Sequence, residues 1–476
     1  MFETGVRQLR LAMSIIWGRP ISARNLERLI GDAIATLEVF GAPGDDVQEL
    51  LDGPFADAKA RREFQNTALR RTAGRLSKRS PYYRAAFAAA GVDPQKLTVD
   101  TVTAIPVTRK RTLVERRHDF LCEGSEPYLT SRTTGTTGAP AEIWISRYEA
   151  EAWPAISALA GVLRDEIRPS DCMQLNISSR ATAAVHHGME LSRLVGSKAR
   201  LLGVIPPDES LDALLTTGDE APTLLNTYPS YLALLLRAAR RRGLGPDDFH
   251  LRRIDCNGEV LSSALARAAA GTFGAEVNDN FGMTEILPVS SRACAQGHLH
   301  HDLNIGYVEV LDLDTGEPVA PGELGSVVIT PYYPYRECMP VFRYDTRDLV
   351  RRLPEEPLAC DLAGTPATSR VLGKADGLLR ADGRAVTTRD LVEVLEGLPS
   401  EPWPARYGAT VAGGRVLLTL SSQTLDGLTT GEVERRFSAS GIDLRVTNGV
   451  SADGGATAFR PLRADLMETT FAGRRP

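Results

Sequence analysis

Between about residues 130 and 350, short apolar runs alternate with segments of helical periodicity. The apolar runs lie at 171–177, 199–205, 223–226 and 252–256, and helical patterns at 231–242 and 262–273 separate them. Buried parallel strands form near-continuous apolar runs, and helices usually connect them. The alternation therefore predicts an α/β fold in which helices cover mixed or parallel sheets.

The pattern changes after residue 300 and again near residue 373. Strand-like runs at 307–313 and 325–330 flank a turn at 314–316, which predicts a β-rich subdomain. The C-terminal part again alternates strand and helix, with strand patterns at 415–420 and 443–446 around a helical pattern at 430–439.

A chain of 476 residues exceeds one ordinary core and should form at least two domains. The first 50 residues have apolar side chains at helical spacing, namely Leu26, Leu29, Ile30, Ile34 and Leu37, and predict two or three helices. We therefore expect a helical N-terminal extension over 1–50, a large lobe over 51–372 and a small α+β lobe over 373–476.

Composition narrows the classes of function. The chain has 55 basic and 60 acidic residues, and the resulting net charge of -5 argues against nucleic acid as the main partner. Its six cysteines are scattered without a CxxC pair, which is typical of reduced thiols in a cytoplasmic protein. No apolar run reaches the ~18 residues that span a bilayer, so no membrane partner is expected.

Small hydroxyl residues and glycines alternate in one segment that ends at Pro140. Its members are Thr133, Thr134, Gly135, Thr136, Thr137 and Gly138. Such a backbone can fold closely around an anion and offer both N–H and O–H donors, as a triphosphate requires. The segment lacks the Gly-Lys-Ser/Thr ending of a Walker A loop. A polar turn between strands is the alternative interpretation.

Four further motifs follow this loop in order. They are Asn257-Gly258-Glu259, the run from Asn278 to Glu285, the run from Gly322 to Thr330, and the run from Pro340 to Asp348. With the loop, they resemble the adenylate-forming superfamily of acyl/aryl-CoA ligases, and most closely its phenylacetate–CoA ligase branch. Ser80–Arg84 and Ile105–Lys110 also match that branch, and the resemblance covers about residues 60–395.

The resemblance implies that the chain binds ATP and Mg²⁺. Phe281 would stack on adenine, with Asn280, Gly282 and the backbone of Asn257, Gly258 and Glu259 around the purine. Thr284 would hydrogen-bond the α-phosphate, and Glu285 would supply a carboxylate oxygen for Mg²⁺. Asp348 would accept hydrogen bonds from the ribose hydroxyls, and Arg343 could pair with it or reach a phosphate. Lys374 completes the nucleotide-binding candidates.

The resemblance also implies a two-step reaction. A carboxylate attacks the α-phosphate of ATP to give an acyl-adenylate and pyrophosphate. The small lobe, joined near residues 373–376, then rotates so that an acceptor can attack the adenylate. Coenzyme A, a carrier-protein thiol and an amine are all candidate acceptors. A homodimer is also considered.

The C-terminal region departs from the family in two respects. The family has a lysine there that reaches the carboxylate and α-phosphate, but this chain has no lysine after Lys374. Arg460 is the candidate replacement, with Arg463 as a second, although a guanidinium differs from an ammonium in shape and reach. The stretch from Val386 to Leu391 also lacks the usual proline and glutamate of the small-lobe motif.

The segment that would line the acid pocket departs as well. Instead of bulky aromatics it has the run from Asn176 to Thr182, which should enlarge or polarise the pocket. Ser179, Arg180, His187 and Met283 are the substrate-binding candidates. Arg180 either pairs with an acidic group of the substrate or is a surface arginine.

Cys256, Cys294 and His300 form a candidate zinc set, similar to sets in some relatives of this branch. Tetrahedral zinc needs a fourth ligand, for which His298 and His301 are available. Buried structural cysteines are the alternative.

The leading hypothesis is therefore an ATP-dependent, AMP-forming ligase of an aryl or related organic acid. One alternative within the fold is an enzyme that activates nitrite for an aryl amine. An alternative of another class is a degenerate homologue that binds nucleotide without catalysis, suggested by the absent C-terminal lysine.

Overall fold

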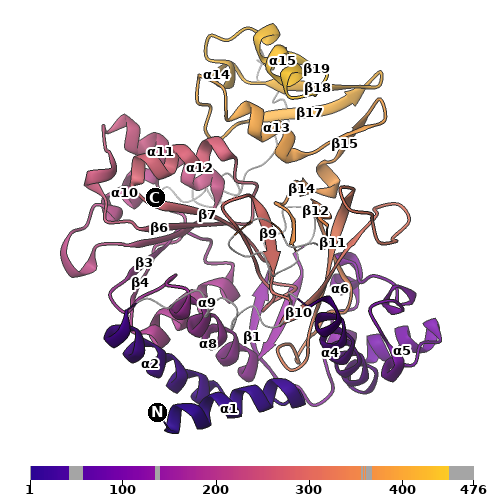
Figure 1. Ribbon diagram of the computed structural model, residues 1–476. Helices are drawn as coiled ribbons and strands as arrows, with labels where there is room; N and C mark the ends of the chain where they lie inside the picture. Colours follow the sequence, from indigo (N-terminus) through magenta and orange to yellow (C-terminus); the bar gives the residue numbers. More distant parts are fainter. Residues whose placement is uncertain are drawn as a thin grey trace, which may run out of the picture. The chain divides into compact units, whose positions relative to one another are not determined.

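The computed structural model describes residues 2–41, 57–133, 140–354, 358, 360 and 367–449. The chain forms two compact units. Unit 1 consists of Met1–Leu175, Ser179–Leu201 and Asn280–Arg370, and unit 2 of Asn176–Ser178, Leu202–Asp279 and Val371–Pro476. Both units mix helices and strands (Figure 1), which confirms the predicted α/β class.

The N-terminal residues form the predicted helices within unit 1. These are α1 (Phe2–Trp17) and α2 (Ala23–Phe40). Helix α2 packs on α8 (Arg147–Leu163) and α9 (Thr182–Val195), and its buried side chains are Leu26, Leu29 and Ile30. Arg71 donates hydrogen bonds to the carbonyls of Ile15 and Ile16 at the end of α1. The N-terminal helices therefore share the core of unit 1.

The remaining helices of unit 1 precede its first strand. They are α4 (Ala58–Arg79), α5 (Pro81–Ala90), α6 (Lys110–Glu115) and α7 (Arg117–Phe120), with the short 3-10 helices η1 (Pro94–Lys96) and η2 (Val102–Ala104). Ser80 caps α5 by accepting a hydrogen bond from the Tyr83 amide, and Pro81 occupies the first helical position, where its missing N–H costs little.

The strands of unit 1 form four groups. Strand β1 (Pro127–Arg132) pairs antiparallel with β2 (Glu142–Ser146), and β3 (Cys172–Leu175) pairs parallel with β4 (Lys198–Leu201). The predicted β-rich subdomain is an antiparallel meander of β10 (Gly306–Leu311), β11 (Leu324–Pro331) and β12 (Tyr344–Arg351). The last group is antiparallel and runs from the end of β7 (Glu276–Phe281) through β8 (Ser291–Ala293) and β9 (His298–His301) to β13 (Ala367–Ser369).

Unit 2 begins with a parallel strand pair and the helices that flank it. The elements are α10 (Pro207–Leu214), β5 (Leu224–Thr227), the 3-10 helix η3 (Gly218–Glu220), α11 (Pro229–Arg241), η4 (Pro246–Asp248), β6 (Arg253–Asn257) and α12 (Ser263–Phe273). Strands β5 and β6 are parallel, as their apolar runs predict. Both helices expected between residues 231 and 273 are present within two residues of their predicted ends.

The C-terminal elements of unit 2 have their own core. They are β14 (Gly373–Lys374), η5 (Ala375–Gly377), β15 (Leu379–Ala381), β16 (Arg384–Val386), α13 (Thr388–Leu395), β17 (Tyr407–Ala412), β18 (Arg415–Leu420), α14 (Ser422–Leu425), α15 (Thr430–Ala439) and β19 (Leu444–Asn448). Strand β18 lies between β17, which is antiparallel, and β19, which is parallel. Its inward side chains pack with Leu395 of α13 and with Val433 and Phe437 of α15. The division into lobes near residue 373 remains a prediction.

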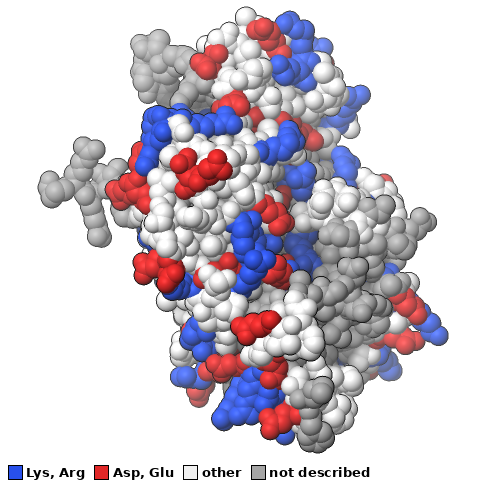
Figure 2. Space-filling model, turned by 60° about the vertical axis from the view of Figure 1, so that its left-hand side comes forward, with Lys and Arg blue, Asp and Glu red and all other residues white. Residues whose placement is uncertain are grey.

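The charged side chains of the surface are mixed. On the face in Figure 2, blue and red side chains are interspersed among uncharged ones. Two pairs within unit 2 illustrate the mixing, Arg241 with Asp208 at 2.7 Å and Arg242 with Asp212 at 2.8 Å. In the segments that the structure describes, every helix is too short or too polar to cross a bilayer.

Candidate active site and metal cluster

The predicted phosphate loop connects β1 to β2 in unit 1. Thr133 closes its neck, because the Thr133 amide donates to the Ala141 carbonyl at 3.0 Å and the Ala141 amide donates to the Thr133 hydroxyl at 2.9 Å. Ala141 is fully buried, which fixes the downstream end of the neck. The other predicted loop residues, Thr134, Gly135, Thr136, Thr137 and Gly138, lie outside the described residues.

Glu285 is a buried carboxylate of unit 1. It lies just beyond β7 and is only 1% exposed. Among the described residues its hydrogen-bond partner is the Tyr344 hydroxyl, which donates to Glu285 Oε1 at 3.2 Å. Burial and the nearby Glu285 carboxylate raise the pKa of Tyr344, which keeps the phenol protonated as a donor. No lysine or arginine of the described chain pairs with Glu285, so its charge has no protein counterion there.

Five candidate residues directly precede Glu285 in the chain, and the first two, Asn280 and Phe281, lie at the end of β7. Phe281 is 8% exposed at the end of the strand, and Asn280 is half-buried beside it. A Cβ added at Gly282 would meet nothing within 4 Å, so the backbone there is open to a ligand. Met283 and Thr284 are half-buried. Their contacts with a nucleotide remain predictions.

Asp348 lies in β12, the same strand that begins with Tyr344. It is 6% exposed, and its backbone amide donates a hydrogen bond to the Thr346 hydroxyl at 3.1 Å. The meander thus connects the ribose candidate with the strand that positions Glu285. Tyr344 was not among the predicted site residues, although it stands inside the Pro340–Asp348 motif.

Arg343 has a different role from the one expected. Its guanidinium pairs with both oxygens of Glu309, at 2.9 and 3.0 Å, and donates to the carbonyls of Thr103 and Ile105. The side chain is 2% exposed. A guanidinium with this set of acceptors is held in the core, so the expected pairing with Asp348 or a phosphate is wrong for this structure.

The predicted adenine loop lies in unit 2, after β6. Gly258 has a φ of 82°, a conformation that side chains rarely adopt, and it lets the chain turn at the strand end. Asn257 donates to the Asn226 side chain at 3.3 Å. Glu259 accepts a hydrogen bond from the Ser230 amide at 2.8 Å, at the first turn of α11. Lys374 is half-buried in β14 of the same unit.

The predicted substrate segment contacts the strand that leads into the phosphate loop. The Thr182 hydroxyl donates to the Thr130 carbonyl at 3.0 Å, and the Ala183 amide donates to the Ser131 hydroxyl at 3.2 Å. Both connect the start of α9 to β1 within unit 1. A pocket for the acid near the loop is therefore compatible with these contacts.

The substrate candidates themselves differ in exposure. Ser179 and Arg180 are exposed. His187 of α9 is different, because burial lowers its pKa to about 4 and its Nδ1 has no hydrogen-bond partner among the described residues. A neutral imidazole with a free nitrogen can bind a polar group of a ligand.

A second group of polar side chains lies in unit 1, away from the motifs above in sequence. It consists of Cys294, His298, His300 and Cys360, whose ligand atoms all lie within 4.8 Å of one another. The Cys360 thiol is 3.5 Å from His300 Nε2, and the His298 amide donates to Cys294 Sγ at 3.3 Å. Gly297, with a φ of 80°, forms the turn between β8 and β9 that brings Cys294 and His298 together.

The cluster corrects the predicted zinc set. Cys294 and His300 belong to it, but Cys256, a fully buried residue of β6, is not among its members. Cys360 takes its place. His301 is also excluded as the fourth ligand, since its two ring nitrogens bond to Ser291 at 2.7 Å and to Thr368 at 3.0 Å. His298 lies on the same strand, and its buried Nδ1 has no hydrogen-bond partner among the described residues.

Two candidate residues of the C-terminal region cannot be placed. Arg460 and Arg463 lie outside the described residues. Their contribution to adenylation therefore stays a prediction.

Comparison with known proteins identifies a family. The model of the family described as AMP-binding enzyme matches residues 82–333. That segment includes the phosphate loop, the adenine loop, Phe281, Thr284 and Glu285.

Two curated relatives are phenylacetate-coenzyme A ligases. The one from Thermus thermophilus is 26% identical over 351 residues, covering 71% of this chain and 76% of that protein. The one from Pseudomonas putida is 27% identical over 333 residues, covering 68% of this chain and 71% of that protein.

Solved structures share the fold at lower identity. A crystal structure of 2-hydroxyisobutyryl-CoA ligase in the postadenylation state, in complex with 2-HIB-AMP, matches with a TM-score of 0.70 and 20% identity, covering 86% of this chain and 89% of that chain. An anthranilate CoA ligase in complex with anthranoyl-AMP matches with a TM-score of 0.51 and 16% identity, covering 72% and 66%.

Proposed function

The chain belongs to the AMP-binding enzyme family, and we propose that it is an ATP-dependent, AMP-forming ligase that joins an aryl or related organic acid to coenzyme A. Glu285 carries the proposal. A carboxylate that is 1% exposed and has one neutral donor is costly unless a cation compensates its charge. A divalent ion bound with ATP would provide that compensation.

The residues fit magnesium as the cation. Glu285 offers a hard carboxylate oxygen, and Thr284 beside it offers a hydroxyl for the α-phosphate. Bound magnesium would neutralise the charge that develops on the phosphate during attack by the acid. Tyr344 donates a hydrogen bond that orients Glu285. Tyr344 and Asp348 lie on the same strand, β12, so one strand would position both the ion ligand and the ribose ligand.

The other motif residues bind and orient the substrates. The loop closed by Thr133 would cradle the triphosphate, and Phe281 would stack on adenine beside Asn280. Asp348 would hold the ribose hydroxyls. These contacts would place the α-phosphate where the carboxylate of the acid can attack it in line, so that pyrophosphate leaves and an acyl-adenylate forms.

His187 is proposed to bind a polar group of the acid. Its neutral ring, free Nδ1 and position on α9, which is bonded to β1, support this role. Arg180 is exposed on the same segment and would suit an acidic group of a larger substrate. Arg460 is proposed to replace the absent C-terminal lysine in adenylation.

Coenzyme A is the proposed acceptor because the curated relatives are coenzyme A ligases of an aryl acid. A carrier-protein thiol and an amine are the alternative acceptors, and nitrite is the alternative to the acid. An activity assay distinguishes these alternatives. The direct experiment incubates the protein with ATP, magnesium and a panel of aromatic acids and measures pyrophosphate and AMP with and without coenzyme A.

We expect acid-dependent pyrophosphate release, and AMP formation that coenzyme A accelerates together with thioester formation. Pyrophosphate release without acceleration by coenzyme A would support the ligase class and contradict this acceptor. Nitrite-dependent AMP formation without any acid would support the nitrite-activating alternative. Tight AMP binding without turnover of any acid or nitrite would support the degenerate homologue.

We further propose that Cys294, His298, His300 and Cys360 bind zinc. Two thiols and two imidazoles within 4.8 Å are a donor set that suits tetrahedral zinc, and the unpartnered Nδ1 of His298 would gain a partner. The ion would connect the β8–β9 turn to the segment before β13. Such a closed set of protein ligands stabilises a fold and leaves no position for a substrate.

Elemental analysis of the purified protein tests the zinc site. We expect about one zinc ion per chain, reduced to near zero in Cys360→Ser, with a lower melting temperature because the site no longer joins its two segments. The control is His250→Ala, an exposed histidine outside the cluster, which should keep the metal. Wild-type protein without stoichiometric metal would contradict the assignment.

A further inference from the structure

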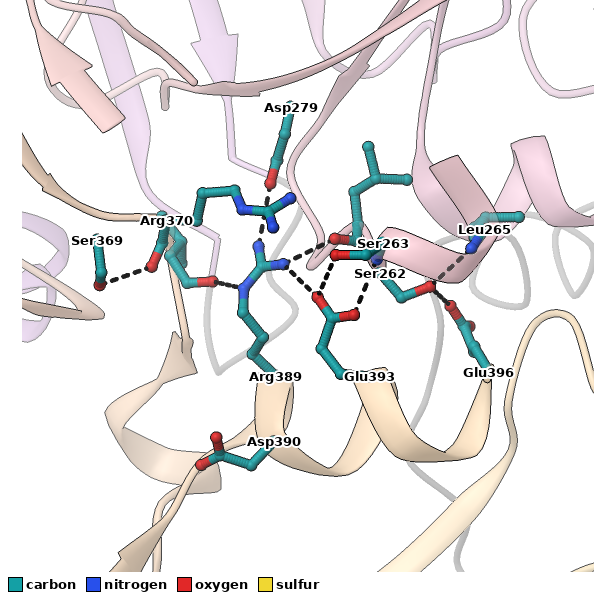
Figure 3. A network of polar contacts seen from close by, with 12 residues as sticks. Ser262, Ser263, Leu265, Asp279, Ser369, Arg370, Arg389, Asp390, Glu393 and Glu396 are labelled. Atoms are coloured by element: carbon teal, nitrogen blue, oxygen red, sulfur yellow. Dashed lines mark hydrogen bonds and ion pairs between the residues drawn. The ribbon is translucent and has the colours of Figure 1, made fainter. Parts of the chain in front are cut away.

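Arg389 and Glu393 of α13, with Glu396 directly after the helix, face one target. Arg389, Glu393 and Glu396 are spaced at i, i+4 and i+7, which places them on one face of the helix. Figure 3 shows them pointing toward Ser262 and Ser263 at the start of α12. Asp390 points away from this face and caps its own helix through Thr387. All the residues of this contact lie within unit 2.

The Arg389 guanidinium donates hydrogen bonds to four acceptors. It donates to Asp279 Oδ2 at 3.0 Å, to the Leu261 carbonyl at 2.8 Å, to Glu393 at 3.1 Å and to the Val371 carbonyl at 2.8 Å. The side chain is 8% exposed. A planar guanidinium can satisfy such a set, which a lysine ammonium cannot reproduce.

The two glutamates hold the first turn of α12. Glu393 accepts hydrogen bonds from the Ser263 amide at 2.9 Å and the Ser263 hydroxyl at 3.3 Å. Glu396 accepts from the Ser262 hydroxyl at 2.5 Å and from the Ala405 amide at 3.2 Å. The first turn of a helix has free N–H groups and a positive dipole end, which favour carboxylates. We call Arg389, Glu393 and Glu396 with these partners the α13 latch.

The partners of the latch adjoin the segments proposed to bind adenine. Leu261 and Ser262 follow the loop of Asn257, Gly258 and Glu259 after one further residue. Asp279 directly precedes Asn280 and Phe281 in the chain. Hydrogen bonds weaken steeply with small displacements. Any shift of either segment on nucleotide binding therefore changes the strength of the latch.

We propose that Arg389 is a positioning residue through which docking of the C-terminal elements on α12 and binding of the adenine nucleotide are coupled. The proposal rests on the proposed nucleotide site. It adds that the α13 latch links this site to the C-terminal elements. By linkage, AMP that favours the latched state must in turn bind more tightly when the latch is intact. Arg389 stands in the stretch from Val386 to Leu391, where this chain lacks the proline and glutamate that the family resemblance leads us to expect.

Hydrogen exchange of the full chain, with and without AMP, tests the coupling. We expect AMP to slow exchange in α13 and in the first turn of α12. Arg389→Met should remove that AMP-dependent protection and weaken AMP binding by about tenfold, within the range typical of coupled sites. Arg389→Lys should restore only part of it. The matched control is Arg435→Ala, an exposed arginine of α15 in the same lobe, which should behave as wild type.

A double-mutant cycle identifies the contact. Asp279→Asn alone should weaken AMP binding less than Arg389→Met does. The double variant should bind AMP only slightly more weakly than Arg389→Met, so that its loss of affinity is smaller than the sum of the two single losses. If Arg389→Met exchanges faster but AMP still protects α12 and α13 as in wild type, Arg389 is a structural residue and the coupling is refuted. Unchanged AMP affinity with unchanged exchange also refutes it while the nucleotide site stands. A wild-type chain that does not bind AMP contradicts the nucleotide site itself, and the coupling with it.

Discussion

At the scale of single residues, the important property of Glu285 is that its charge is buried with one neutral partner. Gln at this position keeps an acceptor for the Tyr344 hydroxyl but loses the charge that a metal ion requires. The substitution therefore separates the electrostatic role of the side chain from its packing.

We predict that Glu285→Gln lowers the rate of acid-dependent ATP–pyrophosphate exchange by about 10²-fold or more, as expected when one electrostatic stabiliser of a transition state is removed. The melting temperature should stay near that of wild type. The measurement is exchange of labelled pyrophosphate at saturating magnesium.

Two further variants accompany Glu285→Gln: Tyr344→Phe tests the positioning of the carboxylate, and Glu317→Gln is the control. Tyr344→Phe keeps the carboxylate and removes only its positioning, so we expect a severalfold loss. Glu317 is exposed in the turn between β10 and β11, and its substitution should leave exchange unchanged. Equal rates for Glu285→Gln and wild type would remove Glu285 from the reaction.

The residues of the site differ in how well the sequence predicts them. Thr133 and Glu285 stand in short motifs whose residue types follow from the chemistry of phosphate and metal binding, so the local sequence is enough to propose them. Cys360 is 60 residues from His300 in the chain, and only the pairing of β13 with β9 brings their segments together. Arg343 was misassigned because its partner Glu309 lies on β10, 34 residues earlier in the chain, and no local pattern encodes such a contact.

At the scale of elements, the residue that caps the C-terminal end of α13, Glu396, is a buried acid whose protonation affects stability. Burial raises the pKa of Glu396 to about 7, and Glu259 of the loop after β6 and Glu393 of the same helix add to the rise. The hydrogen bonds from Ser262 and the Ala405 amide oppose it. A raised pKa in the folded state means that protonation favours the folded state.

We predict that the stability contributed at this position is complete below the ordinary pKa of a glutamate and is lost as the pH rises to about 7. Near pH 8 the ionised side chain should cost about 3 kcal/mol relative to pH 4.5, from the size of the shift. Glu396→Gln should remove this dependence, because the amide can still bond Ser262 and the Ala405 amide. The measurement is the melting temperature of both proteins between pH 5 and pH 8.

A control for this prediction is Glu432→Gln on α15, where the half-buried side chain accepts a hydrogen bond from the Thr429 amide at the start of its own helix. It should leave the slope between pH 5 and pH 8 unchanged. If wild type and Glu396→Gln lose stability in parallel over this range, another group is responsible.

The elements themselves were largely predictable because their patterns are local. Strands β5 and β6 and helices α11, α12 and α15 follow from apolar runs and helical spacing. The α13 latch was not predicted, because Arg389 and Glu393 take their roles from Asp279 and Ser263, more than a hundred residues earlier.

At the scale of the whole molecule, the helices expected in the N-terminal extension belong to unit 1. Ile30 is 0% exposed and Leu26 is 1% exposed where α2 packs on α8 and α9. The Ile21 amide also donates to the Tyr148 hydroxyl of α8 at 3.2 Å. Tertiary packing of this kind is not visible in the helical spacing, which shows only that α2 has an apolar face.

We predict that Ile30→Ala lowers the stability of unit 1 as a whole by about 2–5 kcal/mol, the usual cost of deleting a large buried aliphatic side chain. Val39→Ala is the matched control, because Val39 lies on the same helix but is 73% exposed, and its change should stay within about 0.5 kcal/mol.

Calorimetry of the full chain shows whether α1 and α2 unfold together with unit 1 or independently of it. If α1 and α2 fold with unit 1, Ile30→Ala shifts the main unfolding transition to lower temperature. If they are independent, the main transition stays in place and only a small early transition changes, which would contradict the shared core. Since α9 also carries His187, a shift of the main transition would further mean that the N-terminal helices support the helix proposed to bind the acid.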